Sequence, residues 1–167
     1  MSSVEPAVAV LNLLYNNWTA TPAQDTGTGA DQGIATKDPR KVHFTNRWFA
    51  PVPNRIHPHQ ITVRPLSKPY KPITIGSLTK YSNFEQIAIH VWVLPNPQLT
   101  IEGAHADLYN MLQEIRRIIR ILGETAGSGI QHLLLSPWQD KSELDKDAPR
   151  LHVEGRATAI TFEMSTS

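Results

Sequence analysis

Apolar residues recur every three or four positions near the start of the chain, which is the spacing of an amphipathic helix. The pattern predicts a helix over residues 6–18. Ser2 or Ser3 can cap it, with Glu5 and Pro6 in the first turn, where a carboxylate meets the positive helix end. Its apolar stripe consists of Ala7, Leu11, Leu14 and Trp18.

The same periodicity returns over a longer stretch and predicts a second helix from about residue 103 to residue 124. Gly123 marks its end, because glycine is common just past the last helical residue. The apolar stripe of this helix consists of Leu108, Leu112, Ile115, Ile119 and Leu122.

Segments in which apolar and polar residues alternate, and short segments that are apolar throughout, predict β-strands between and after the helices. The strands cover residues 42–49, 60–66, 72–78, 85–94, 130–136 and 151–164. In the second of these, Ile61 and Val63 alternate with Thr62 and Arg64, which indicates one wet face. Residues 85–94 are apolar on both faces, as in a central strand that a helix, another sheet or a partner subunit covers on each side.

The last predicted strand changes parity along its length. Leu151 and Val153 occupy odd positions, whereas Ile160 and Phe162 occupy even ones. We therefore expect a β-bulge near Gly155, since one inserted residue would return all of these side chains to a single buried face.

The element order predicts an α+β fold. We expect a mostly antiparallel sheet with the N-terminal helix and one long helix packed on one face, plus an extended loop or hairpin. The 167 residues suit a single domain. Residues 19–38 are rich in Thr, Gly, Ala, Asp and Gln and predict a long mobile loop.

Composition removes several classes of protein. The chain has no cysteine, which excludes disulfides, zinc ribbons, iron–sulfur clusters and thiol nucleophiles. It has no apolar run near the roughly 20 residues that cross a bilayer, and its first residues carry no basic region, so we expect neither a membrane span nor a cleaved signal peptide.

The formal net charge of +1 conceals a segregation of charge along the sequence. Residues 39–84, here called the basic segment, contain eight basic residues, no acidic residue and seven of the thirteen prolines. The rest of the chain has eight basic and fifteen acidic residues, a net charge of −7. A proline-interrupted basic segment of this kind suits edge strands, a long hairpin or an arm.

Two readings of the basic segment remain open. Its cations alternate with aromatic residues such as Trp48 and Tyr70, a mixture that single-stranded nucleic-acid binding platforms use. The same charges would also dock an arm on an acidic neighbour. We favour self-association, because the complementary negative charge lies in the same chain and a head-to-tail interface would join the two patches.

Enzymatic motifs are weak in this sequence. His57 and His59 could face one metal ion from an extended strand, but Pro58 separates them and no carboxylate is nearby. The glycine-rich stretch at residues 123–129 lacks the features of a nucleophile elbow and of a phosphate-binding loop. We therefore predict no catalytic residue, no metal site and no cofactor, with a metal-dependent hydrolase built on the two histidines as the enzymatic alternative.

The element order resembles that of the tail terminator, or tail-completion, proteins of tailed viruses. The stretches that carry the resemblance are residues 6–18, 60–66, 86–94, 104–122 and 151–164: an N-terminal helix, strands, a central apolar strand, a long helix and a C-terminal strand pair. The loop at residues 19–38 and the His-Pro-His segment depart from the family pattern and leave another head–tail connector or neck protein open.

The resemblance implies a structural virion protein, located in the tail or neck, that forms a homohexameric ring at the end of the tail tube. Such a ring stops tube polymerisation and joins the tail to the neck, so its partners are further copies, the tail tube protein and a neck protein. DNA would be met only as it passes through the lumen. The expected interface residues are Arg47, Trp48, Arg55, Arg64, Lys68, Tyr70, Lys71, Arg116, Arg117 and Arg120.

Overall fold

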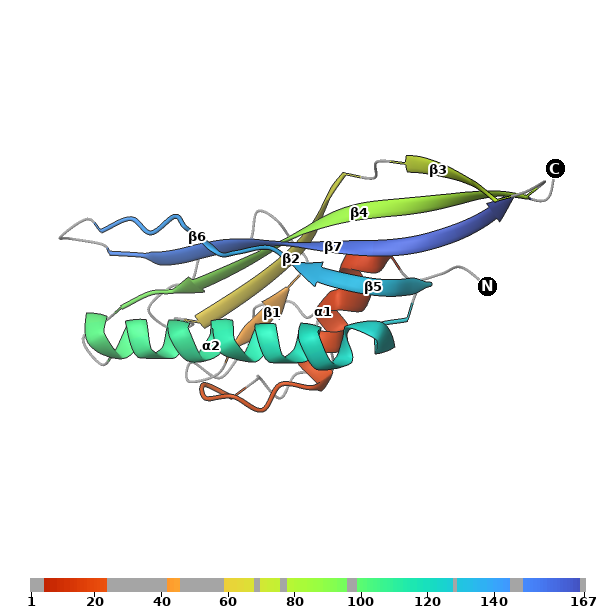
Figure 1. Cartoon of the computed structure of the whole chain (residues 1–167). Helices are drawn as coiled ribbons and strands as arrows, with labels where there is room; N and C mark the ends of the chain where they lie inside the picture. The colour runs from red at the N-terminus through yellow and green to blue at the C-terminus, as the bar shows by residue number, and fades with distance from the viewer. Residues whose placement is uncertain are drawn as a thin grey trace.

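A computed structural model describes residues 5–23, 42–45, 59–67, 70–75, 78–95, 99–127, 129–144 and 149–165. Residues 67, 70–75, 78–83 and 162–165 are described by their backbone alone. Two α-helices, α1 (Pro6–Asn16) and α2 (Ile101–Leu122), pack on one face of a single sheet (Figure 1). The predicted α+β architecture, with both helices on one face of the sheet, is confirmed.

The sheet has seven described strands. They are β1 (His43–Thr45), β2 (His59–Ser67), β3 (Tyr70–Ile75), β4 (Leu78–Val93), β5 (Ile130–Leu135), β6 (Gln139–Asp140) and β7 (Leu151–Ser165). The main path runs β1-β2-β4-β7-β5, with β3 paired to β4 and β6 paired to β7. All of these pairs are antiparallel except β1–β2, which is parallel.

The helix boundaries follow from their end residues. Glu5 is the N-cap of α1 and Pro6 is its first residue, so Glu5 precedes the first turn that we had assigned to it. Helix α2 begins two residues before its predicted start, because the Thr100 side chain accepts a hydrogen bond from the Gly103 amide. It ends at Gly123, which opens a short 3₁₀ turn, η1 (Gly123–Thr125).

The hydrophobic core lies between the helices and the odd-numbered face of the sheet. The predicted stripe of α1 is buried throughout, and α2 buries Leu108, Ile115 and Ile119. The strands contribute fully buried residues to the same cluster, chiefly Ile61, Val63, Ile87, Ile89, Val91 and Val93. Burial of one such side chain stabilises the fold by roughly 1.5–3 kcal/mol, so this layer holds the helices on the sheet.

The other face of the sheet differs from two predictions made from the sequence: that Thr62 and Arg64 lie on a wet face, and that a helix, another sheet or a partner subunit covers residues 85–94 on each side. Both helices lie on the opposite side, so no described helix covers the even positions of β4 (Figure 1). Nevertheless Gln60 and Thr62 of β2 and His90 of β4 are almost fully buried. Their neighbours on adjacent strands share this face, and large polar and aromatic side chains there enclose one another, as described below.

Strand β4 begins at Leu78, seven residues before the predicted start. Its first part pairs with β3, and the register Tyr70↔Asn83 to Ile75↔Leu78 forms a hairpin from the C-terminal part of the basic segment, which includes Lys71 and Lys80. Figure 1 shows that this hairpin and the end of β7 extend beyond the helical layer. Of the predicted loop at residues 19–38, residues 24–38 lie outside the described part of the chain.

The predicted bulge at Gly155 is wrong. The β4–β7 register runs without interruption from Thr79↔Ser165 to Val93↔Leu151. The core face continues through Ala157 and Ala159, so the even-numbered Ile160 belongs to the other face. A register shift occurs instead in the β5–β7 pair, between Ile130 and His132.

Gly155 has a packing role in place of the expected bulge. A Cβ atom at this position would lie 2.5 Å from Cζ3 of the Trp138 ring, which therefore rests directly on the glycine backbone. We expect Gly155→Val to lower the free energy of unfolding by about 1–3 kcal/mol, the usual range for overpacking, measured by chemical denaturation. Arg156→Ala, an exposed change on the next residue, should alter it by less than about 0.5 kcal/mol.

Combining Gly155→Val with Trp138→Ala separates this clash from a general intolerance of valine. The double variant should lose less stability than the sum of the two single variants, because removing the ring makes room for the new side chain. Strict additivity would contradict the proposed packing.

Candidate functional site

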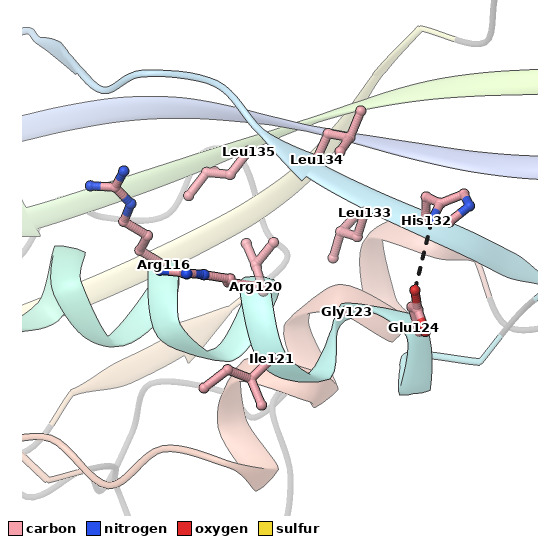
Figure 2. Close-up of a pocket in the computed structure, with 10 residues that line it drawn as sticks. Arg116, Arg120, Ile121, Gly123, Glu124, His132, Leu133, Leu134 and Leu135 are labelled. Atoms are coloured by element: carbon pink, nitrogen blue, oxygen red, sulfur yellow. Dashed lines mark ion pairs between the residues drawn. The ribbon is translucent and has the colours of Figure 1, made fainter.

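A groove lies between the second half of α2 and strand β5, at one edge of the sheet (Figure 2). It has a volume of about 530 Å³. Its lining comes from three consecutive elements: Arg116, Ile119, Arg120 and Ile121 of α2, Gly123 and Glu124 of η1, and His132, Leu133, Leu134 and Leu135 of β5. The lining is thus mainly apolar, with Arg116 and Arg120 on the helix and with Glu124 Oε1 3.8 Å from His132 Nδ1 (Figure 2).

Local geometry keeps this groove at an open edge. Within the described residues β5 pairs with β7 alone, and its other side has no strand partner. Gly123 lets the end of α2 approach β5, since a Cβ there would lie 3.1 Å from Leu133 Cβ. Leu133 points toward the helix and is buried, whereas Leu134 points to the other side of the strand and is 59% exposed (Figure 2).

The three arginines predicted as interface residues on α2 have different surroundings. Arg116 and Arg120 are exposed and line the groove, and Arg116 extends from the helix toward Leu135 (Figure 2). Arg117 lies on another side of the helix, where its Nη2 donates to the Asn17 carbonyl at 3.0 Å and to Glu114. It therefore fastens the end of α1 to α2.

Glu114 is the centre of that fastening. Its carboxylate accepts hydrogen bonds from Arg117 and from both the amide and the hydroxyl of Thr19, the latter two at 3.0 and 3.1 Å. Burial alone would raise the pKa of Glu114, but these hydrogen bonds outweigh it and hold the pKa below its usual range. The network joins α1 to α2 and leaves only Arg116 and Arg120 of the three arginines for contacts in the groove.

The other predicted interface residues are placed as follows. Arg64 lies on the sheet face that no described helix covers, and Tyr70 and Lys71 lie on β3, described by backbone alone. Arg47, Trp48, Arg55 and Lys68 lie outside the described residues. The structure therefore brings none of the basic segment's predicted residues, as far as they are described, to the groove.

A second feature, here called the histidine cluster, occupies the sheet face opposite the helices. Trp92 stacks on His90 and on His152, with ring centroids 5.1 and 4.5 Å apart. His90 Nδ1 lies 2.9 Å from His152 Nε2, and Arg64 Nε donates to His90 Nε2 at 3.3 Å. Because His90 Nε2 accepts a hydrogen bond from Arg64, the proton of the neutral His90 ring resides on Nδ1 and is donated to His152. These two hydrogen bonds define the neutral tautomer of His90.

The cluster also contains an ion pair between the exposed Lys141 and the buried Glu154. Lys141 Nζ lies 2.6 Å from Glu154 Oε2, and Glu154 is only 6% exposed. The hydrogen bond from Lys141 lowers the pKa of Glu154. For His90 the main influence is burial, which together with His152 lowers its pKa from 6.5 to about 4. The imidazole is therefore neutral at neutral pH, enclosed by Arg64, Lys141 and Glu154.

Sequence reasoning missed this cluster. His90 and His152 lie 62 residues apart, so no local spacing in the sequence associates them. Their shared face follows from the register Trp92↔His152 and His90↔Glu154, which only the pairing of β4 with β7 supplies. The sequence shows that these side chains occupy even positions on their strands, but it does not show that the two strands pair with each other.

The metal hypothesis finds no support among the described residues. His59 is buried and its Nε2 contacts Asp107 Oδ2 of α2 at 2.8 Å, so it ties β2 to the helix. Burial lowers the pKa of His59 despite this carboxylate. His57 lies outside the described residues, and the part of the chain that is described contains no group of three potential metal ligands. The partner Asp107 was not identified from the sequence.

Comparison of the sequence with models of known protein families gave no match, and comparison with curated proteins gave none either. Among the described residues, no helix is long and apolar enough to span a membrane. The features that define the site are therefore its own: a groove with apolar side chains and two arginines, at a sheet edge that pairs with no described strand, and a polar cluster on the face opposite the helices.

The neutral state of His90 predicts a pH dependence of stability. Its folded pKa lies below the unfolded value, so between pH 6.5 and 4 the unfolded chain binds the extra proton and stability falls as pH falls. We expect this residue to contribute a loss of up to about 3 kcal/mol over that window. In His90→Gln the loss between pH 7 and pH 4 should shrink by a comparable amount, measured by urea denaturation at each pH.

The quantity compared is the change in the free energy of unfolding with pH, so a constant loss of stability caused by the substitution itself does not affect the test. His105→Gln, an exposed histidine on α2, is the matched control and should leave the pH profile of the native protein unchanged. An identical profile for His90→Gln and the native chain would contradict the assignment of His90 as a buried neutral group.

Proposed function

We propose that the chain is a structural protein that associates with copies of itself into a ring, as a tail terminator at the end of a viral tail tube. The observation that supports this most directly is the groove at the β5 edge. It combines an unpaired strand, exposed apolar side chains and two exposed arginines on one surface.

An edge strand of this composition is suited to an assembly. Natural sheet edges that remain in solvent are usually protected by lysine, proline, bulges or a covering loop. The sequence of β5 is Ile-Gln-His-Leu-Leu-Leu, with no proline and no lysine, and its register shift lies between Ile130 and His132, before the three leucines that line the groove. Leu134 on this strand is 59% exposed and Ile121 on the neighbouring helix is 65% exposed. A partner that covers this edge would remove both from water.

The segregation of charge adds to this argument. The groove is lined by Arg116 and Arg120, which belong to the part of the chain that carries a net charge of −7, so the excess of acidic residues in that part lies away from these two arginines. Two complementary but different patches on one chain produce a heterologous contact, which repeats head to tail and closes into a ring when the rotation allows it. A ring stacked on a tube needs no reaction and no cofactor, and its partners would be the tube protein and a neck protein. The same surface would serve another head–tail connector.

A single-stranded nucleic-acid binding module is the second candidate, supported by Arg64, Arg156 and Trp92 on the face without helices. Base stacking requires an accessible aromatic face. The Trp92 ring, however, is already stacked on His90 and His152, and His90 is 2% exposed. Self-association is therefore better supported. Binding of a single-stranded oligonucleotide that weakens steeply with salt would favour the second candidate.

Native mass spectrometry and sedimentation over a wide concentration range test the proposal. We expect one closed species, with six subunits if the chain is a tail terminator of the type it resembles. Addition of that species to polymerising tail tubes should stop their growth. A monomer at every concentration would contradict ring formation, and a ring without effect on tubes would leave self-association but remove the terminator role.

Charge reversal of the groove gives a second measurement. Arg116→Glu combined with Arg120→Glu should raise the dissociation constant of the assembly by at least about tenfold, as expected for loss of desolvated charge contacts. Arg120→Glu alone changes the net charge by −2, and Arg156→Glu, the reversal of an exposed cation on the opposite sheet face, changes it by the same amount and is its matched control. Equal effects of the two changes would indicate a general response to net charge and would contradict a specific role of the groove.

A further inference from the structure

The segment between β6 and β7, here called the acidic hairpin and described for residues 139–144 and 149–152, presents an exposed leucine. Leu144 is 69% exposed, more than any other exposed large apolar residue described. Glu143 precedes it and is also exposed. A large apolar side chain held in water beside a carboxylate is a feature that a partner surface would cover.

Hydrogen bonds fix the backbone that carries Leu144. Glu143 and Arg150 exchange both of their backbone hydrogen bonds, at 2.8 and 2.7 Å. The Lys141 amide donates to the His152 carbonyl at 2.7 Å, and the Ser142 amide donates to Asp140 Oδ1 at 2.9 Å. Since these residues are ordered before any contact, docking of the hairpin would cost little conformational entropy.

The groove between α2 and β5 complements this hairpin in both polarity and charge. Its base is formed by Ile119, Leu133 and Leu135, and a leucine side chain occupies much less than its volume of about 530 Å³. Arg116 and Arg120 stand on its helical side. The described residues of the hairpin have two acidic side chains, Asp140 and Glu143, and two basic ones, Lys141 and Arg150. Because Lys141 pairs with Glu154, Arg150 is the one cation among them that opposes the two carboxylates.

The hairpin cannot occupy the groove of its own chain. Glu143 lies opposite Arg150, whereas Leu135 of the groove lies opposite Ala157 on the same strand. Seven residues of extended strand separate the two points, roughly 23 Å at about 3.3 Å per residue. Figure 1 shows β6 and the start of β7 near the beginning of α2, whereas the residues of α2 that line the groove belong to its second half. A contact between these surfaces therefore joins two molecules.

We propose that the groove binds the acidic hairpin of a neighbouring copy of this chain, with Leu144 in the groove and Glu143 facing Arg116 and Arg120. This inference rests on the proposed self-association and names its contact. Each subunit then provides one hairpin and one groove, which is the head-to-tail arrangement that a closed ring requires.

Leu144→Ser tests the apolar part of the contact in the full-length protein. Loss of one buried leucine should raise the dissociation constant of the assembly about tenfold or more, by sedimentation equilibrium. Tyr109→Ser, a change of a 63% exposed residue on α2, is the matched control and should leave assembly unchanged. Both residues are exposed in the single chain, so at concentrations low enough to dissociate the assembly the unfolding midpoints should match that of the native protein and exclude a folding defect.

A charge exchange tests the partner of the hairpin. Glu143→Arg and Arg120→Glu should each weaken assembly about tenfold, because each brings like charges together in the contact. An equimolar mixture of the two variants should recover assembly: the reversed hairpin of one fits the reversed groove of the other, and the remaining pairs are native. The mixture must then alternate, with equal amounts of the two chains and an even number of subunits by native mass spectrometry.

The outcomes separate this inference from the proposed function. Assembly of the native chain that tolerates Leu144→Ser and Glu143→Arg overturns the hairpin contact while self-association stands. Loss with Arg120→Glu but no recovery in the mixture also overturns it, since the groove would then bind another segment. A native chain that never assembles overturns both. Recovery in the alternating mixture supports the contact.

Discussion

The pairing of β4 with β7 is the constraint on which the rest of the molecule depends. Fifteen consecutive residue pairs join the two strands without a register shift, from Thr79↔Ser165 to Val93↔Leu151. Because side chains alternate with a period of two, one register assigns every side chain of both strands to a face. It places Ile87, Ile89, Val91 and Val93 under the helices and places the histidine cluster on the other side. A slip of one residue would exchange an apolar core for buried imidazoles and charges.

The two faces of this ladder are stabilised in different ways. Toward the helices, apolar burial is non-directional and tolerates changes of shape as long as volume is kept. On the opposite face, each group needs its specific partner: Arg64 donates to His90, His90 donates to His152, and Lys141 pairs with Glu154. Leaving one of these buried groups without its partner costs more than the interaction gains. The polar face therefore contributes specificity of register, while the apolar face supplies most of the stabilisation.

Function, in this picture, belongs to surfaces that the fold leaves at its edges. The same helix, α2, uses Arg117 internally to hold α1 and presents Arg116 and Arg120 on the groove. Strand β5 lies at an edge of the described sheet and carries the exposed Leu134. The connection between β6 and β7 carries the exposed Glu143. These two surfaces, among the described residues, are the basis of the proposal that the chain joins copies of itself.

Periodicity alone determined the two helices, the strands that follow them and the α+β class, because a local repeat of 3.6 or 2 residues is written in consecutive side chains. It also isolated Gly155, but it predicted a bulge there, since nothing local reveals that the Trp138 ring rests on that glycine. Two contacts depended on partners 48 or more residues away in the sequence, that of His59 with Asp107 and that of His90 with His152. The first half of β4 depended on its backbone pairing with β3. The three arginines of α2 were equivalent in sequence. Only the packing of α1 against α2 decided that Arg117 is internal, and only the position of β5 decided that its two neighbours line a groove.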